Sequence, residues 1–135
     1  MNQEERTKTL QAIQNIASTC AMIAWHKGFH DDENALLEHL LDTNASAALQ
    51  DWTKSAILQA ELARIASEVG EAVEAVRKPG KDQHLPQFDG VVVELADVII
   101  RIMDTCGKRN WPIGEAILEK MTYNATRPHK HGKKS

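Results

Sequence analysis

Apolar residues in the first part of the chain recur in steps of three and four. Between Glu4 and Lys27 they form the series Leu10, Ile13, Ile16, Cys20 and Ile23. This spacing places them on one face and predicts an amphipathic helix, which Gly28 is suited to end. A second, shorter helix is expected to follow, with Asp31 or Asp32 as its cap. Residues 42–46 have the composition of a turn.

Three further helices are predicted after this turn. One runs from Thr53 to about Arg77 and ends at the helix-breaking residues 78–80. The next covers 91–106, where the many valines and isoleucines make a strand the alternative. A strand would place Glu94 and Asp97 on opposite faces, whereas a helix places them on one polar stripe with Arg101 and Asp104. The helix is therefore favoured.

The last helix is expected to open at Trp111 and Pro112, with the proline in its first turn, and to reach about Ala125. Five helices and no second pattern predict an all-α fold, a helical bundle. The 135 residues are expected to form one domain, with a core at about 54–127 and a basic, flexible tail at 128–135.

Composition removes several classes of function. The net charge of −3 gives no reason to expect a nucleic-acid partner. The polar N-terminus and the lack of an apolar run of about 20 residues predict a cytoplasmic protein without membrane contact. The two cysteines, Cys20 and Cys106, lack metal-ligand spacing, and reduced thiols are favoured over one disulfide between them.

Two acidic pairs carry the chemistry. Glu68 and Glu71, and then Glu94 and Asp97, are each spaced i, i+3, so each pair shares a helix face. Facing each other on neighbouring helices, four carboxylates would repel unless a divalent cation lay among them. Oxygen ligands without His or Cys favour Mg²⁺, with Mn²⁺ as a possible substitute.

Several other readings of these charges remain. Glu68 with Arg64, and Asp97 with Arg101, would make ordinary ion pairs on a solvated surface. A di-iron bundle would need Glu-x-x-His, which does not occur in the sequence. His26 and His30 have a spacing that can bind zinc, but Gly28 lies between them near the expected helix end. Surface or loop histidines are the favoured interpretation.

The last helix offers groups suited to phosphate. Lys120, Asn124 and Arg127 follow steps of four and three, so they share a face. Two cations and an amide suit phosphate oxygens, and beside a metal they would neutralise a polyphosphate. The alternative is that these cations simply stabilise the C-terminal end of a helix.

The order EVGE, then ELAD, then EKMTYNATRPHKHG resembles the MazG-like, all-α nucleoside triphosphate pyrophosphohydrolases. The resemblance covers roughly residues 54–133, and IAWHKGFHDDEN near the N-terminus adds to it. It implies hydrolysis of a nucleoside triphosphate or deoxynucleoside triphosphate to the monophosphate and pyrophosphate, and assembly as a homodimer or homotetramer. Nucleotide-pool cleansing is a role that such a reaction would suit.

The resemblance also assigns roles to residues. Glu68, Glu71, Glu94 and Asp97 would hold Mg²⁺. Our hypothesis for the mechanism adds that Glu68 or Glu71 orients or deprotonates the attacking water. Lys120, Asn124 and Arg127 would lie near the phosphates, and Phe29, with Trp25, would contact the base. The chain departs from the family at Ser67, where many members have a second glutamate.

That departure leaves two other functions open. One is a non-catalytic helical bundle that binds nucleotides or a partner protein. The other keeps the hydrolytic chemistry on another pyrophosphate-containing metabolite.

Overall fold

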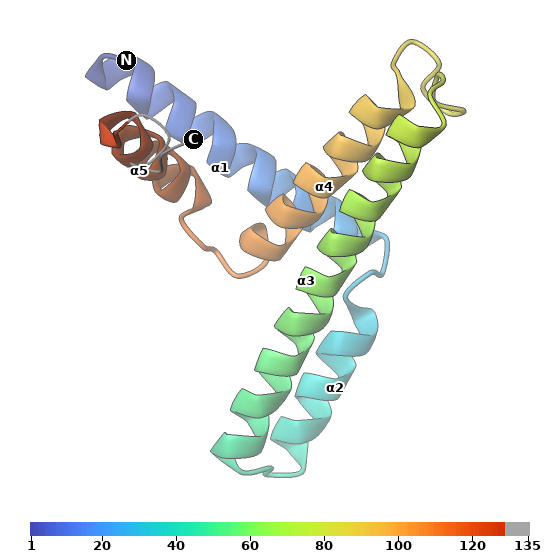
Figure 1. The fold of residues 1–135 in the computed structure, drawn as a ribbon. Helices are drawn as coiled ribbons and strands as arrows, with labels where there is room; N and C mark the ends of the chain where they lie inside the picture. The colour runs from blue at the N-terminus through green and yellow to red at the C-terminus, as the bar shows by residue number, and fades with distance from the viewer. Residues whose placement is uncertain (129–135) are drawn as a thin grey trace.

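The computed structural model describes residues 1–128, and within them the regular structure is entirely helical. This confirms the prediction of an all-α helical bundle. Of the tail predicted at 128–135, all but Pro128 lies outside the described residues. The helices, labelled in Figure 1, are α1 (Gln3–His26), α2 (Asp31–Asp42), α3 (Ala47–Arg77), α4 (Gly90–Gly107) and α5 (Ile113–Thr126).

The helix ends differ from the prediction in three places. α3 begins six residues earlier than Thr53, because the Ser46 side chain caps it by accepting from the Leu49 backbone N–H. The predicted aspartate cap of α2 is wrong: the capping position is His30, and Asp31 and Asp32 lie in the first turn. There their charges still favour the helix dipole. Pro112 is the capping residue of α5 rather than a member of its first turn.

The end of α1 follows the prediction. Gly28 has a positive φ of 75°, a conformation that an L side chain rarely adopts. The chain therefore turns sharply after α1, and Phe29 and His30 lie in the short connection to α2.

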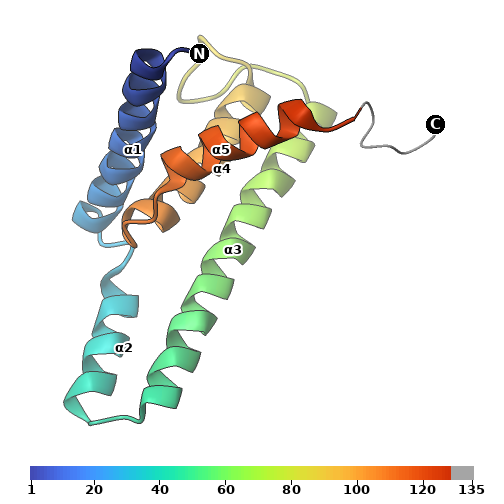
Figure 2. The ribbon, with the colours of Figure 1, turned by 90° about the vertical axis from the view of Figure 1, so that its left-hand side faces the viewer.

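The arrangement of the helices is shown in Figures 1 and 2. α3 and α4 lie side by side and antiparallel, and α1 packs against α4. α5 crosses α1 and packs against it, on the other side of the molecule from α3. α2 runs beside the first half of α3, and this pair projects beyond the other helices.

Gly107 allows α4 to approach α1 closely. A Cβ atom at this position would lie 2.1 Å from the carbonyl oxygen of Ala17, which is fully buried. A side chain there would force the two backbones apart. The contact fixes the C-terminal end of α4 against the middle of α1.

The apolar surface is only partly covered within one chain. The buried apolar side chains are few and mostly small: Ala17, Ala24, Ala72, Met103, Cys106 and Leu118. Many large ones are about half exposed, among them Leu62, Val73, Val76, Leu95 and Ile99 on α3 and α4. None of the described helices is long and apolar enough to cross a membrane.

The total accessible surface also indicates that one chain leaves much of its surface uncovered. The chain exposes 10067 Å², whereas a folded monomer of 15.0 kDa is expected to expose about 7,000 Å². Fully extended, the seven residues outside the described range would add about 1,200 Å². The excess is therefore larger than that segment can explain.

Candidate functional site

Three of the four acids singled out in the sequence lie together. Glu68 on α3 and Glu94 and Asp97 on α4 each offer a carboxylate oxygen within 4.8 Å of the others. We call these three residues the acid cluster. They meet because α3 and α4 are antiparallel neighbours, so an acidic face on one helix is opposed by an acidic face on the other.

Glu71 lies outside the acid cluster. It is one helical turn beyond Glu68 and is exposed, as is Ser67. Its charge still acts on the site: the pKa of Glu94 is raised, first by partial burial and then by the negative charges of Asp97, Glu71 and Glu68. A raised pKa is the expected result of gathering carboxylates that lack enough positive charge.

The ion pairs proposed as the surface alternative do not form. Arg101 donates from Nε to Oε1 of Glu68 across the helix interface at 3.0 Å, rather than pairing with Asp97 along α4. Arg64 pairs instead with Glu33 at 3.1 Å. Within residues 1–128, Arg101 is the one cation joined to the acid cluster by an ion pair.

The donor set of the acid cluster fits a hard divalent cation. Its three members supply carboxylate oxygens, and one arginine offsets only part of their negative charge. Mg²⁺ is bound in proteins through a small number of carboxylates while it keeps several waters. Glu68, Glu94 and Asp97 are therefore the residues that would hold the ion.

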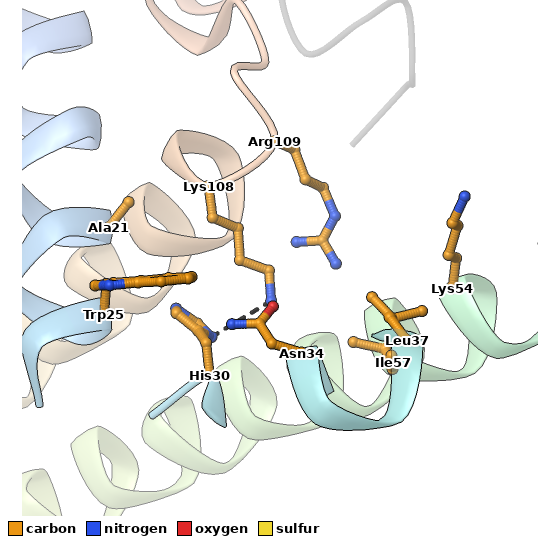
Figure 3. Close-up of a pocket in the computed structure, with 9 residues that line it drawn as sticks. All are labelled: Ala21, Trp25, His30, Asn34, Leu37, Lys54, Ile57, Lys108 and Arg109. Carbon is orange, nitrogen blue, oxygen red and sulfur yellow. Dashed lines mark hydrogen bonds between the residues drawn. The ribbon is translucent and has the colours of Figure 1, made fainter. Parts of the chain in front are cut away.

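A second group of possible ligands has a different character. His30, Glu33 and Glu61 also bring three ligand atoms within 4.8 Å. The ammonium group of Lys108 occupies the space among them, 2.6 Å from Glu33, 3.4 Å from Nδ1 of His30 and in contact with Glu61. The chain thus supplies its own cation here. Figure 3 shows Lys108 reaching His30 from the end of α4.

We call this group, with two further members, the lysine network. Arg109 donates to Glu61 at 2.6 Å, and Asp104 contacts Nε2 of His30 at 2.8 Å. Burial favours a raised pKa for Glu33, but Lys108 and Arg64 outweigh it and hold that pKa below its ordinary value. The network consists of His30, Glu33, Glu61, Asp104, Lys108 and Arg109.

The prediction of surface or loop histidines holds for both residues, but His30 is a buried loop residue and not a surface one. His26 is exposed, but His30 is 5% exposed and sits at the centre of the lysine network. Its partners are Asp104 of α4 and Glu33 in the first turn of α2. Glu61 of α3 belongs to the same network through its contact with Lys108. Separations of up to 78 residues leave no local signal of this cluster, apart from the polar stripe that contains Asp104.

A cavity of about 340 Å³ lies directly beside the acid cluster. Glu68 and Asp97 line it together with Phe29, Ile100, Arg101 and Asp104. The Phe29 ring is 60% exposed, and the Arg101 guanidinium lies 5.8 Å from the ring centroid. We call this space the acid-side cavity. It gives the acidic residues an adjoining compartment with an aromatic wall.

Trp25 lines a different space. A cavity of about 440 Å³ is bounded by Trp25, Asn34, Leu37, Lys108 and other residues, as Figure 3 shows. No acid-cluster residue lines this second cavity. The sequence-based prediction paired Phe29 and Trp25 at one base. In the structure they line two different cavities, Phe29 the acid-side cavity and Trp25 the second one.

The predicted phosphate-binding residues are not assembled with the acids in one chain. The ammonium of Lys120 on α5 lies 4.9 Å from the ring centroid of Tyr123, and the guanidinium of Arg127, which follows the end of α5, lies 5.9 Å from it. Asn124 shares an open apolar surface with Lys120 and Met121. Across residues 1–128, no hydrogen bond or ion pair joins these three to the acid cluster.

The two cysteines are free thiols. Cys106 is buried, and burial raises the pKa of its thiol despite the nearby Arg109. Cys20 is partly buried and lines the acid-side cavity. Burial and the negative charge of Asp104 raise the pKa of the Cys20 thiol.

Compared with protein-family models, curated proteins and solved structures, the chain matches none of them.

Proposed function

We propose that this protein is a Mg²⁺-dependent nucleoside triphosphate pyrophosphohydrolase. The observation that carries the proposal is the acid cluster next to the acid-side cavity, with Glu68 and Asp97 belonging to both. A triphosphate needs a divalent cation, and its nucleoside needs a partly apolar space within reach of that cation. The acid cluster and the wall formed by Phe29 and Ile100 supply these two requirements.

The charge of the site favours a metal-bound substrate over a bare anion. Three carboxylates against one arginine would repel a free polyphosphate. A bound Mg²⁺ would reverse this, neutralise phosphate oxygens and make water more acidic. Arg101 stays beside Glu68, where its remaining N–H groups can donate to a phosphate or base oxygen.

The residues of the chain divide the work in the proposed reaction. Glu68 is engaged by Arg101, so Glu71, which is exposed and close to the acid cluster, is the better candidate to accept a proton from the attacking water. The water oxygen bonds to the α-phosphorus, the bond to the bridging oxygen breaks, and pyrophosphate leaves. Glu94 and Asp97 remain ligands.

The proposed enzyme is a homodimer or homotetramer. The half-exposed apolar residues of α3 and α4 and the excess of exposed surface call for a second copy that covers them. An oligomer is also the arrangement in which Lys120, Asn124 and Arg127 of a neighbouring chain can approach the phosphates. Sedimentation equilibrium measures this, and a monomer at micromolar concentration would exclude it.

The test of the function is pyrophosphate release from a panel of ribo- and deoxyribonucleoside triphosphates with Mg²⁺. We expect turnover of at least one substrate, and a loss of 100-fold or more, about 2.7 kcal/mol in activation free energy, in Asp97→Asn. Asp51→Asn is the matched control, because Asp51 is exposed on the first part of α3.

Three outcomes separate the possibilities. Near-normal turnover in Asp97→Asn would show that Asp97 is not a ligand. Binding of nucleotides without release of pyrophosphate would favour the non-catalytic helical bundle. Turnover confined to other pyrophosphate-containing metabolites would keep the chemistry and change the substrate.

A further inference from the structure

Asp104 lies in the acid-side cavity at the end away from the acid cluster. It is seven residues beyond Asp97 on α4, so it is two helical turns and about 10 Å along the same face. This separation is comparable to the reach of a nucleoside from its α-phosphate to the outer edge of its base. A ligand held by its phosphates at Asp97 would therefore bring its base edge near Asp104.

The orientation of Asp104 is fixed by a buried partner. Its Oδ1 lies 2.8 Å from Nε2 of His30, which is 5% exposed. Nδ1 of His30 faces Lys108 at 3.4 Å and Glu33 at 3.5 Å. A neutral ring that accepts from Lys108 carries its proton on Nε2, and a protonated ring carries one on both nitrogens. In either state His30 donates to Asp104.

The second oxygen of Asp104 remains available to a ligand. Among the described residues, the side-chain hydrogen bond of Asp104 uses Oδ1 alone, and no fully buried side-chain oxygen is left without a partner. Oδ2 is therefore accessible, and Asp104 lines the acid-side cavity. Burial raises the pKa of the Cys20 thiol on the same wall, and the negative charge of Asp104 adds to this.

The polar side chains that line this cavity are mostly hydrogen-bond acceptors. Glu68, Asp97 and Asp104 present carboxylates, which only accept, and Arg101 presents N–H groups, which only donate. Phe29 and Ile100 supply apolar contact for a planar ring. A base in this space can stack on Phe29 and offer an N–H group to Asp104.

We propose that Asp104, held by His30, makes the acid-side cavity selective for a base with an exocyclic amino group. This rests on the proposed function for the substrate class, since it assigns the base end of the same site. Cytosine would donate an amino N–H to Oδ2, whereas uracil in the same position would oppose its C4 carbonyl oxygen to a carboxylate and would have to shift to offer its N3–H instead. Two acceptors that face each other in a partly buried site leave both unpaired, which disfavours uracil.

The test compares dCTP with dUTP, which differ in the 4-amino or 4-carbonyl group that would face Asp104 and in the neighbouring N3, an acceptor in cytosine and an N–H donor in uracil. Dissociation constants of their α,β-imido analogues are measured with Mg²⁺, alongside kcat/KM for the two triphosphates. We expect the wild-type protein to favour the cytosine member by about 10- to 100-fold. Asp104→Asn presents an N–H donor as well, so the ratio should fall close to one.

Asp51→Asn is again the control and should leave the ratio unchanged. Thermal unfolding and circular dichroism establish whether Asp104→Asn keeps the fold, and the wild-type comparison stands without that variant. Equal binding of the two analogues by the wild-type protein would overturn the assignment, and hydrolysis of both triphosphates would then leave the proposed function intact. Selective binding without hydrolysis would overturn the proposed function and keep the role of Asp104.

Discussion

The acid cluster and the lysine network both gather carboxylates that repel one another, but they differ in how far cations of the chain offset that charge. Each brings three possible metal ligands within 4.8 Å, and each draws on α3. In the lysine network, Lys108 and Arg109 neutralise Glu33 and Glu61. In the acid cluster, one arginine at the edge contacts Glu68, and the pKa of Glu94 is raised.

The difference shows that clustered acids alone do not define a metal site. Glu61, at 6% exposed, is more deeply buried than any acid-cluster residue, yet its negative charge is already matched within the chain. The acid cluster retains unmatched charge and borders a cavity with room for a ligand. Charge balance, rather than burial or ligand count, is therefore what distinguishes the acid cluster from the lysine network.

Lys108→Met gives the largest expected effect. It removes the ammonium from among Glu33, Glu61 and His30 and leaves each of the two buried carboxylates with a single arginine partner. We expect the free energy of unfolding to fall by about 3–5 kcal/mol, measured by urea denaturation. Lys8→Met is the control, because Lys8 is 75% exposed and its pair with Glu4 is worth less than about 0.5 kcal/mol. A cost below about 1 kcal/mol would contradict the comparison.

Magnesium should act on the acid cluster and not on the lysine network. Free Mg²⁺ at a hundredfold excess over its Kd should stabilise the wild-type protein by about 2.7 kcal/mol, measured by thermal or urea unfolding. Asp97→Asn should lose this gain, whereas Glu33→Gln should keep it even though it is less stable at the outset. No gain in the wild-type protein at millimolar Mg²⁺, with or without nucleotide, would argue for ordinary surface charge.

The smallest expected effect is a contrast in pH dependence without metal. The pKa of Glu94 is raised in the fold, so its ionisation costs stability as pH rises through that pKa. The pKa of Glu33 is lowered, so its contribution is present above the ordinary value of about 4.3 and is lost as pH falls through the lowered pKa.

Two glutamine variants measure this contrast. Glu94→Gln should match the wild-type protein near pH 4 and become more stable than it towards pH 7, by less than about 1 kcal/mol. Glu33→Gln should be less stable than the wild-type protein at pH 7, and this deficit should shrink on acidification. Urea denaturation across this pH range reports both differences. If both variants were more stable than the wild-type protein at pH 7, or both less stable, the distinction between the two sites would be contradicted.

Local pattern was sufficient for the helices and for the faces on which the acids lie. Apolar spacing, the polar stripe of 91–106 and the helix-breaking residues together predicted all five helices, and the i, i+3 spacing predicted that Glu94 and Asp97 share a face. The local pattern failed at the starts of two helices. The Ser46 hydroxyl sets the start of α3, and the His30 backbone sets the start of α2. Capping depends on a single local geometry that several neighbouring residues can satisfy.

The sequence by itself determined the helices of this protein and the composition of each helical face, because both depend on residues within a few positions of one another. Only the tertiary structure decided which charges meet. It paired Arg101 with Glu68 rather than with Asp97, and it brought Lys108 to Glu61 across 47 residues of chain. Such partners are chosen by the packing of α3 and α4 and by the turn at Gly28, and no local spacing encodes them.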